Sequence, residues 1–148
     1  MKFIVAFVLC VVVVNAELSK EFQEAVLKKV MEVGEKCAKQ ENASQQDIDE
    51  LMTRKNPSRK EGKCLIACFN EEFGVQGKDG KMSKDGVMAA LAPYKAEDEG
   101  LYNKLVKLLT EDCMPQVKSS DRCEAAAELD ACYHQNADDE IKKADAIF

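Results

Sequence analysis

The feature that most constrains the fold is a pair of cysteines, Cys64 and Cys68, separated by three residues inside an apolar run. Each residue of an α-helix turns by about 100°, so the two side chains would lie roughly 40° apart on one helix face. A disulfide directly between them would be strained, because the sulfur atoms would have to bridge along the helix axis. Each cysteine is therefore expected to bond to a different element, so that one helix holds two others.

The residues around this pair favour a helix at about 58–73. Ser58-Arg59-Lys60-Glu61 has the pattern of a capping box, in which a serine and a glutamate three residues later cap a helix N-terminus. Apolar side chains then recur at helical spacing, at Leu65, Ile66, Phe69 and Phe73.

The first sixteen residues have the pattern of a secretory signal peptide. Lys2 is followed by twelve uncharged residues, Phe3 to Val14, and then by small residues around Ala16. This apolar stretch is shorter than the ~20 residues that a membrane-spanning helix needs. We expect cleavage after Ala16, which removes Cys10 and leaves residues 17–148 as one secreted, extracellular domain.

Six cysteines remain after this cleavage, an even number that suits disulfides in an oxidising compartment and disfavours a zinc site: Cys37, Cys64, Cys68, Cys113, Cys123 and Cys132. Cys123 and Cys132 are nine residues apart, which would place them on opposite sides of a helix and prevent their pairing. Excluding this pair and the Cys64–Cys68 pair leaves ten of the fifteen possible connectivities.

Charge and composition narrow the class further. The chain without residues 1–16 has 20 basic and 27 acidic residues, a net charge of −7, which argues against nucleic acid or an anionic membrane as a partner. Leucine, valine, alanine and methionine are plentiful and alternating β-branched runs are few, which predicts an all-α fold. Six helices are expected, at 19–39, from 44 to before 56, at 58–73, from 83 to near 93, from about 96 to 113, and at 120–135, followed by a tail at 136–148.

The spacing of the cysteines resembles that of the insect odorant-binding (pheromone-binding/general odorant-binding) family. The gaps are 26, 3, 44, 9 and 8 residues, and the loop Gly77-Lys78-Asp79-Gly80-Lys81-Met82 is also similar to members of this family. The resemblance implies the disulfides Cys37–Cys68, Cys64–Cys123 and Cys113–Cys132. It also implies a compact six-helix domain with three interlocked disulfides around an internal apolar cavity, which holds a small hydrophobic molecule.

The candidate ligand-binding residues come from several helices, and ordinary core packing remains the alternative for each. They are Ile66, Phe69, Val75, Met82, Met88, Leu91, Tyr94, Leu105, Leu109, Leu129, Tyr133 and Phe148. Tyr94 and Tyr133 would offer hydroxyls to an alcohol, aldehyde or ester. The methionines Met31, Met52, Met82, Met88 and Met114 would either adapt to ligands of varied shape or fill gaps in the core.

The resemblance also makes the tail a candidate lid, because in relatives the segment after the last cysteine can fold back as part of the pocket wall. Ile147 and Phe148 could plug the cavity, with Asp145 or the terminal carboxylate as an anchor that acid would release, and with His134 gaining charge near pH 6. The alternative is a solvated tail and an exposed histidine.

The resemblance implies a non-catalytic extracellular carrier of odorants or pheromones that delivers its ligand towards a membrane receptor as a monomer or weak homodimer. One histidine excludes most histidine-based active sites, and no metal site or cofactor is expected. The alternatives are a secreted defence or reproductive-fluid protein that acts through its surface, and a carrier of a non-olfactory lipid or hormone. Asn42-Ala43-Ser44 is an acceptor sequence for N-glycosylation.

Overall fold

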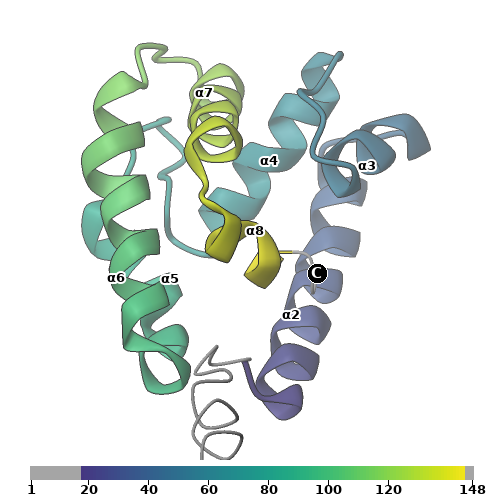
Figure 1. Ribbon diagram of the computed structural model, residues 1–148. Coiled ribbons are helices and arrows are strands. Elements are labelled where there is room, and N and C mark those ends of the chain that lie inside the picture. Colours follow the sequence, from purple (N-terminus) through teal and green to yellow (C-terminus); the bar gives the residue numbers. More distant parts are fainter. Residues whose placement is uncertain (1–17, 146–148) are drawn as a thin grey trace, which may run out of the picture.

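The computed structural model describes residues 18–145, so the expected signal peptide at 1–16 lies outside the described residues. The described part is all-helical, which confirms the predicted fold class (Figure 1). Its α-helices are α2 (Lys20–Gln40), α3 (Gln45–Met52), α4 (Lys60–Glu72), α5 (Lys84–Glu97), α6 (Glu99–Lys107), α7 (Arg122–Asn136) and α8 (Asp139–Asp145). A π-helical turn at Leu108–Cys113 and a 3₁₀ turn at Met114–Gln116 follow α6.

Two helix pairs form the body of the molecule. α4 packs on α7 in the centre, and α5 packs on α6 along one side, while α2 stands on the other side and contacts mainly α4 (Figure 1). α8, the seventh helix described, lies within the segment expected to be a tail and packs against α6. None of the helices within residues 18–145 is long and apolar enough to cross a membrane.

The three disulfides have the pairing that the family resemblance implies. Cys37–Cys68 joins α2 to α4, Cys64–Cys123 joins α4 to α7, and Cys113–Cys132 joins the π-helical turn to α7. Their Cα–Cα distances are 5.6, 4.4 and 5.6 Å. α4 therefore carries two cysteines bonded to two different helices, as the spacing of Cys64 and Cys68 predicted.

Short polar patterns start several helices. Ser44 and Asp47 form a reciprocal capping box at α3, and the Ser83 hydroxyl accepts a hydrogen bond from the Gly86 amide at α5. Gly86 also allows the carbonyl oxygen of Gly74 to approach closely, because a Cβ atom at this position would clash with it.

The capping box predicted at Ser58 is wrong. Arg59 occupies the N-cap position of α4 and makes no side-chain capping bond. The backbone amide and hydroxyl of Ser58 instead donate to the Glu50 carboxylate at 2.9 and 2.8 Å. Glu61 pairs with the Arg59 guanidinium at 3.2 Å. Ser58 therefore bonds to Glu50 of α3 rather than capping α4.

The predicted end of a helix near Pro93 is also wrong, because α5 continues through Pro93 to Glu97. Proline removes one helical hydrogen bond and usually ends or kinks a helix. The turn beyond it is held by the Tyr94 ring, which packs edge-on against Phe22 of α2 with centroids 4.9 Å apart. The amide of Asp98 also donates to the Tyr94 carbonyl at 2.8 Å.

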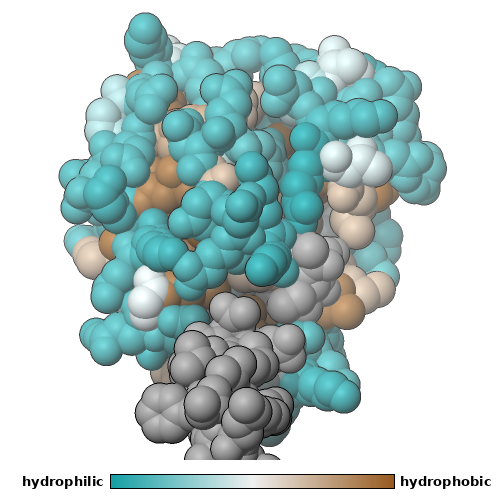
Figure 2. Space-filling view, viewed as in Figure 1, coloured by the Kyte–Doolittle hydropathy of each residue, from teal (hydrophilic) through white to brown (hydrophobic). Residues whose placement is uncertain are grey.

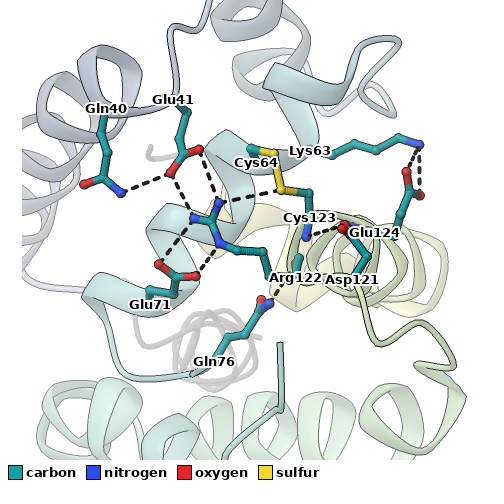
Figure 3. The surroundings of a disulfide bond; sticks show 10 residues. All are labelled: Gln40, Glu41, Lys63, Cys64, Glu71, Gln76, Asp121, Arg122, Cys123 and Glu124. Atoms are coloured by element: carbon teal, nitrogen blue, oxygen red, sulfur yellow. Dashed lines mark hydrogen bonds and ion pairs between the residues drawn. A yellow bond between two sulfur atoms is a disulfide. The ribbon is translucent and has the colours of Figure 1, made fainter. Parts of the chain in front are cut away.

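An ion-pair network beside the Cys64–Cys123 disulfide joins the ends of three helices (Figure 3). The Arg122 guanidinium, at the start of α7, donates to the carboxylates of Glu41 and Glu71 at distances of 2.7 to 3.3 Å. Glu41 follows α2 and Glu71 lies at the end of α4, and both carboxylates are largely buried. Hydrogen bonding from Arg122 lowers the pKa of Glu41.

We predict that Arg122→Ala lowers the free energy of unfolding by about 2–4 kcal/mol, because it leaves two largely buried carboxylates without their cation. Lys63→Ala is the control, since it removes a more exposed ion pair with Glu124 and should cost less than about 1 kcal/mol. Urea denaturation with the disulfides intact measures both. Equal losses in the two variants would show that the network does not brace the fold.

The lowered pKa of Glu41 also determines in which direction the stability of the fold changes with pH. The stabilising contribution of Glu41 is present above its unfolded pKa and is lost as the pH falls through its lower folded pKa. The difference in stability between the wild type and Arg122→Ala should therefore shrink below about pH 4.

Candidate ligand cavity

Two adjoining cavities lie between the helices and share the side chains of Asn70, Leu91, Tyr94 and Leu109 as a common wall. The first, here called the α7 cavity, has a volume of about 210 Å³. The second, here called the α2 cavity, has a volume of about 440 Å³. Figure 2 shows that polar residues cover most of one face of the molecule and that hydrophobic residues show through in recesses between them.

The α7 cavity is lined by side chains that share one face of each surrounding helix. Ile66 and Asn70 are four residues apart on α4, and Leu129 and Tyr133 are four residues apart on α7. The remaining lining residues are Leu91, Tyr94, Leu105, Leu109, Asp130 and Ala144.

The α2 cavity lies between the N-terminal half of α2 and the facing side of α5. α2 contributes Phe22, Ala25, Val26, Lys29 and Val30. The rest of the lining is Asn70, Phe73, Val75, Val87, Ala90, Leu91, Pro93, Tyr94 and Leu109. Apolar side chains therefore dominate the wall, as in most sites for small molecules.

Few polar groups border the cavities. Asp130 lines the α7 cavity and pairs with His134 one turn later on α7, at 3.3 Å. Asn70 borders both cavities, and its side-chain amide donates to Gln76 at 3.3 Å. The backbone carbonyl oxygen of Asn70 accepts a hydrogen bond from the backbone amide of Val75 at 2.8 Å, which fixes the loop after α4 against the cavities.

Eight of the twelve predicted binding residues lie in the cavity walls: Ile66, Val75, Leu91, Tyr94, Leu105, Leu109, Leu129 and Tyr133. Three do not. Phe69 stacks on Phe73 beside the Cys37–Cys68 disulfide, Met82 packs on the core between α6 and α7, and Met88 is 39% exposed. Phe148 lies outside the described residues.

Three of the five methionines neither line a cavity nor fill a gap in the core, the two roles expected from the sequence. Met31 and Met52 are 58% and 64% exposed, so they lie at the surface together with Met88. Met82 and Met114 pack against the core and do not line either cavity.

Sequence reasoning missed the contribution of α2. Phe22, Val26 and Val30 recur at helical spacing, which fits the helix expected at 19–39 but does not show what they face, and only Val33 and Cys37 of α2 are buried. An apolar stripe looks the same in a sequence whether it faces a packed core or a cavity. The available signal was Lys29, a charged residue within the stripe.

α8 covers part of the α7 cavity. Ala144 lines it, and Ile141 is buried at 3% exposure in the adjoining core. The Asp138 carboxylate accepts a hydrogen bond from the Ile141 amide at 2.9 Å, which lowers the pKa of Asp138. Lys104 of α6 pairs with both Asp138 and Glu140. The segment after the last cysteine is thus a docked helix at least to residue 144.

These features define a small all-helical protein in which three disulfides hold helices around apolar cavities. The chain belongs to the PBP/GOBP family, whose model matches residues 19–136. This family comprises binding proteins and carriers rather than enzymes.

Two *Drosophila melanogaster* proteins are similar in sequence. General odorant-binding protein 28a is 27% identical over 86% of this chain and 89% of its own length. General odorant-binding protein 19d is 24% identical over 82% of this chain and 80% of its own length.

Two solved structures share the fold. The structure of the *Drosophila* odorant-binding protein OBP28a matches with a TM-score of 0.65 and 26% identity, covering 82% of this chain and 96% of that chain. The fatty acid binding protein OBP56a, from the oral disk of the blowfly *Phormia regina*, matches with a TM-score of 0.56 and 30% identity, covering 80% and 94%.

The position of the cavity wall predicts that alanine substitutions at two neighbouring residues of α4 lower the stability by different amounts. Leu65 is 1% exposed and lines neither cavity, whereas Ile66 lines the α7 cavity. Leu65→Ala should lower the free energy of unfolding by about 3–5 kcal/mol, and Ile66→Ala by about 1 kcal/mol less, because Ile66 has fewer packing partners to lose. Denaturant titration measures both, and an equal or larger loss for Ile66→Ala would contradict the cavity at this position.

Proposed function

We propose that this protein is an extracellular carrier that holds a small hydrophobic molecule in the two adjoining cavities. The observation that carries the proposal is the nearly continuous apolar wall, built from six α-helices, the π-helical turn after α6 and the loop after α4. Family membership and the name of the fatty acid binding relative support a ligand of this kind.

The physical basis is the replacement of missing contacts. Side chains around an empty apolar space lack dispersion partners on one side, and a hydrophobic ligand supplies them while its own surface leaves water. The disulfides oppose the cost of such incomplete packing, since each stabilises the fold by roughly 2–4 kcal/mol in the chain-entropy model.

The proposed contacts for the ligand are the eight predicted residues in the cavity walls together with the missed α2 residues Phe22, Val26 and Val30. Tyr94 borders both cavities, and Tyr133 borders the α7 cavity, so their hydroxyls are the candidate partners for a polar end of the ligand. Secretion, delivery to a membrane receptor and a monomeric or weakly dimeric state complete the proposed role.

Leu91 and Met88 lie on the same helix and test the site as a matched pair. Leu91 borders both cavities, whereas Met88 is exposed and borders neither. Titration with the fluorescent apolar probe N-phenyl-1-naphthylamine should show saturable binding that Leu91→Ala weakens roughly 3- to 20-fold, from the loss of buried CH₂ contacts. Met88→Ala should leave it unchanged. Failure of the wild type to bind the probe saturably would favour a protein that acts through its surface.

We also propose that α8 and the residues after it act as a lid on the α7 cavity. The Lys104 ion pairs and the Asp138 cap hold α8 in place. Because the pKa of Asp138 is lowered, its contribution is present above the unfolded value of about 4 and is lost as the pH falls below it. A contribution from His134, which pairs with Asp130, would add a change near pH 6, where a histidine gains charge.

Probe affinity measured at pH 7.4, 5 and 3.5 tests this lid. The full-length chain should lose more affinity on acidification than a variant without residues 141–148. Lys104→Met should weaken α8 docking without shortening the chain, and Lys107→Met is its control because that lysine pairs with Asp112. Identical pH profiles for the full-length and shortened proteins would end the lid proposal.

A further inference from the structure

Lys29 occupies an unusual position on α2. At about 100° per residue, Phe22, Val26 and Val33 lie within roughly 40° of one another on the helix, and Lys29 lies about 20° from Phe22 on the same face. Lys28 lies about 120° from Phe22, on the side away from this face. A helix that used this face only for core packing would carry an apolar residue at position 29.

Lys29 lies where its charge could contact a ligand in the α2 cavity. Lys29 is the one charged residue among the described residues that line the α2 cavity, and it is also exposed to solvent, so it lies at the cavity edge. Within residues 18–145 the structure gives its ammonium group no ion pair or hydrogen bond. The residue one turn earlier on the same helix, Ala25, is small and also lines the α2 cavity.

We propose that the α2 cavity binds an amphiphile with a carboxylate head, whose hydrocarbon chain lies against the apolar wall and whose head pairs with Lys29. This inference rests on the proposed carrier function and adds the chemical class and orientation of the ligand. The cavity volume of about 440 Å³ is within the range of about 300–1,000 Å³ typical of small-molecule sites.

The charges of the two cavities set the orientation. Lys29 lines only the α2 cavity, and Asp130 lines only the α7 cavity. A carboxylate is attracted to the first and repelled by the second, and low-polarity walls strengthen both effects relative to water. The shared wall at Leu91, Tyr94 and Leu109 is apolar apart from the tyrosine hydroxyl and Asn70, so the hydrocarbon end faces the α7 cavity.

The competing explanation is that Lys29 only contributes its aliphatic stem to the wall while its ammonium group stays hydrated. In that case the charge would not distinguish ligands. The two explanations differ in one measurable quantity, which is the ratio of affinities for a carboxylate and for an uncharged ligand of equal chain length.

The experiment compares dodecanoic acid with dodecan-1-ol by displacement of N-phenyl-1-naphthylamine at pH 7.4 and low ionic strength. Lys29→Met keeps an unbranched apolar side chain and removes the charge, and Lys28→Met is the matched control on the other side of α2. We expect Lys29→Met to weaken the acid roughly two- to fivefold relative to the alcohol, the size of an exposed ion pair. Lys28→Met should leave the ratio unchanged. Raising the salt concentration should lower the acid-to-alcohol affinity ratio in the wild type and in Lys28→Met, which keep Lys29, but not in Lys29→Met.

Lys29→Glu is the second variant. It should lower the ratio of acid affinity to alcohol affinity further and leave the affinity for the alcohol unchanged. An acid-to-alcohol ratio that is the same in the wild type, Lys29→Met and Lys29→Glu would overturn the assignment while leaving the carrier function intact. Failure of the wild type to bind either ligand would overturn both. Circular dichroism of each variant establishes that the compared proteins are folded.

Discussion

The covalent attachment of α4 to two other helices is the constraint on which the rest of the structure depends. Cys68 fixes α4 to α2 and Cys64 fixes it to α7, and these bonds close separations of 31 and 59 residues. Closing chain segments of this length removes much conformational freedom from the unfolded state. The framework therefore tolerates unfilled space between helices, which a small domain held by its core alone would find costly.

The position of each attachment explains where the cavities lie. α2 is fixed near its C-terminal end, by Cys37 and by the adjacent Glu41–Arg122 ion pair. Its N-terminal half has no disulfide among the described residues, and it meets α5 through the Phe22–Tyr94 contact and a hydrogen bond from the Ser19 amide to the Glu97 carboxylate at 3.0 Å. The apolar stripe of that half consequently faces an open space, so one helix supplies both a structural anchor and a ligand wall.

The sequence predicted features that depend on local patterns and failed where a distant partner intervenes. The helices expected to begin at 44 and 83 are present, and the side chains of Ser44 and Ser83 cap them. The cap at Ser58 fails because Glu50 takes its hydrogen bonds, and the stop at Pro93 fails because packing beyond it holds the helix. The disulfide pairing needed the family resemblance, since geometry alone left ten connectivities. Placement relative to the cysteines, which resembles that of the family's lining residues, pointed to Ile66, Leu129 and Tyr133, and these residues border the α7 cavity.

The missed α2 wall shows what distinguishes a cavity face from a core face in a sequence. Phe22, Val26 and Val30 fit either, because both environments favour apolar side chains at helical spacing. Lys29 fits only the cavity face. An unpaired ammonium group in a closely packed core would cost several kcal/mol, whereas at a cavity edge it stays hydrated or pairs with a charged ligand. The nine other residues that face the α2 cavity from outside this helix are apolar apart from Asn70 and Tyr94. A single charge inside an otherwise apolar stripe is therefore evidence that the stripe borders space accessible to solvent or ligand.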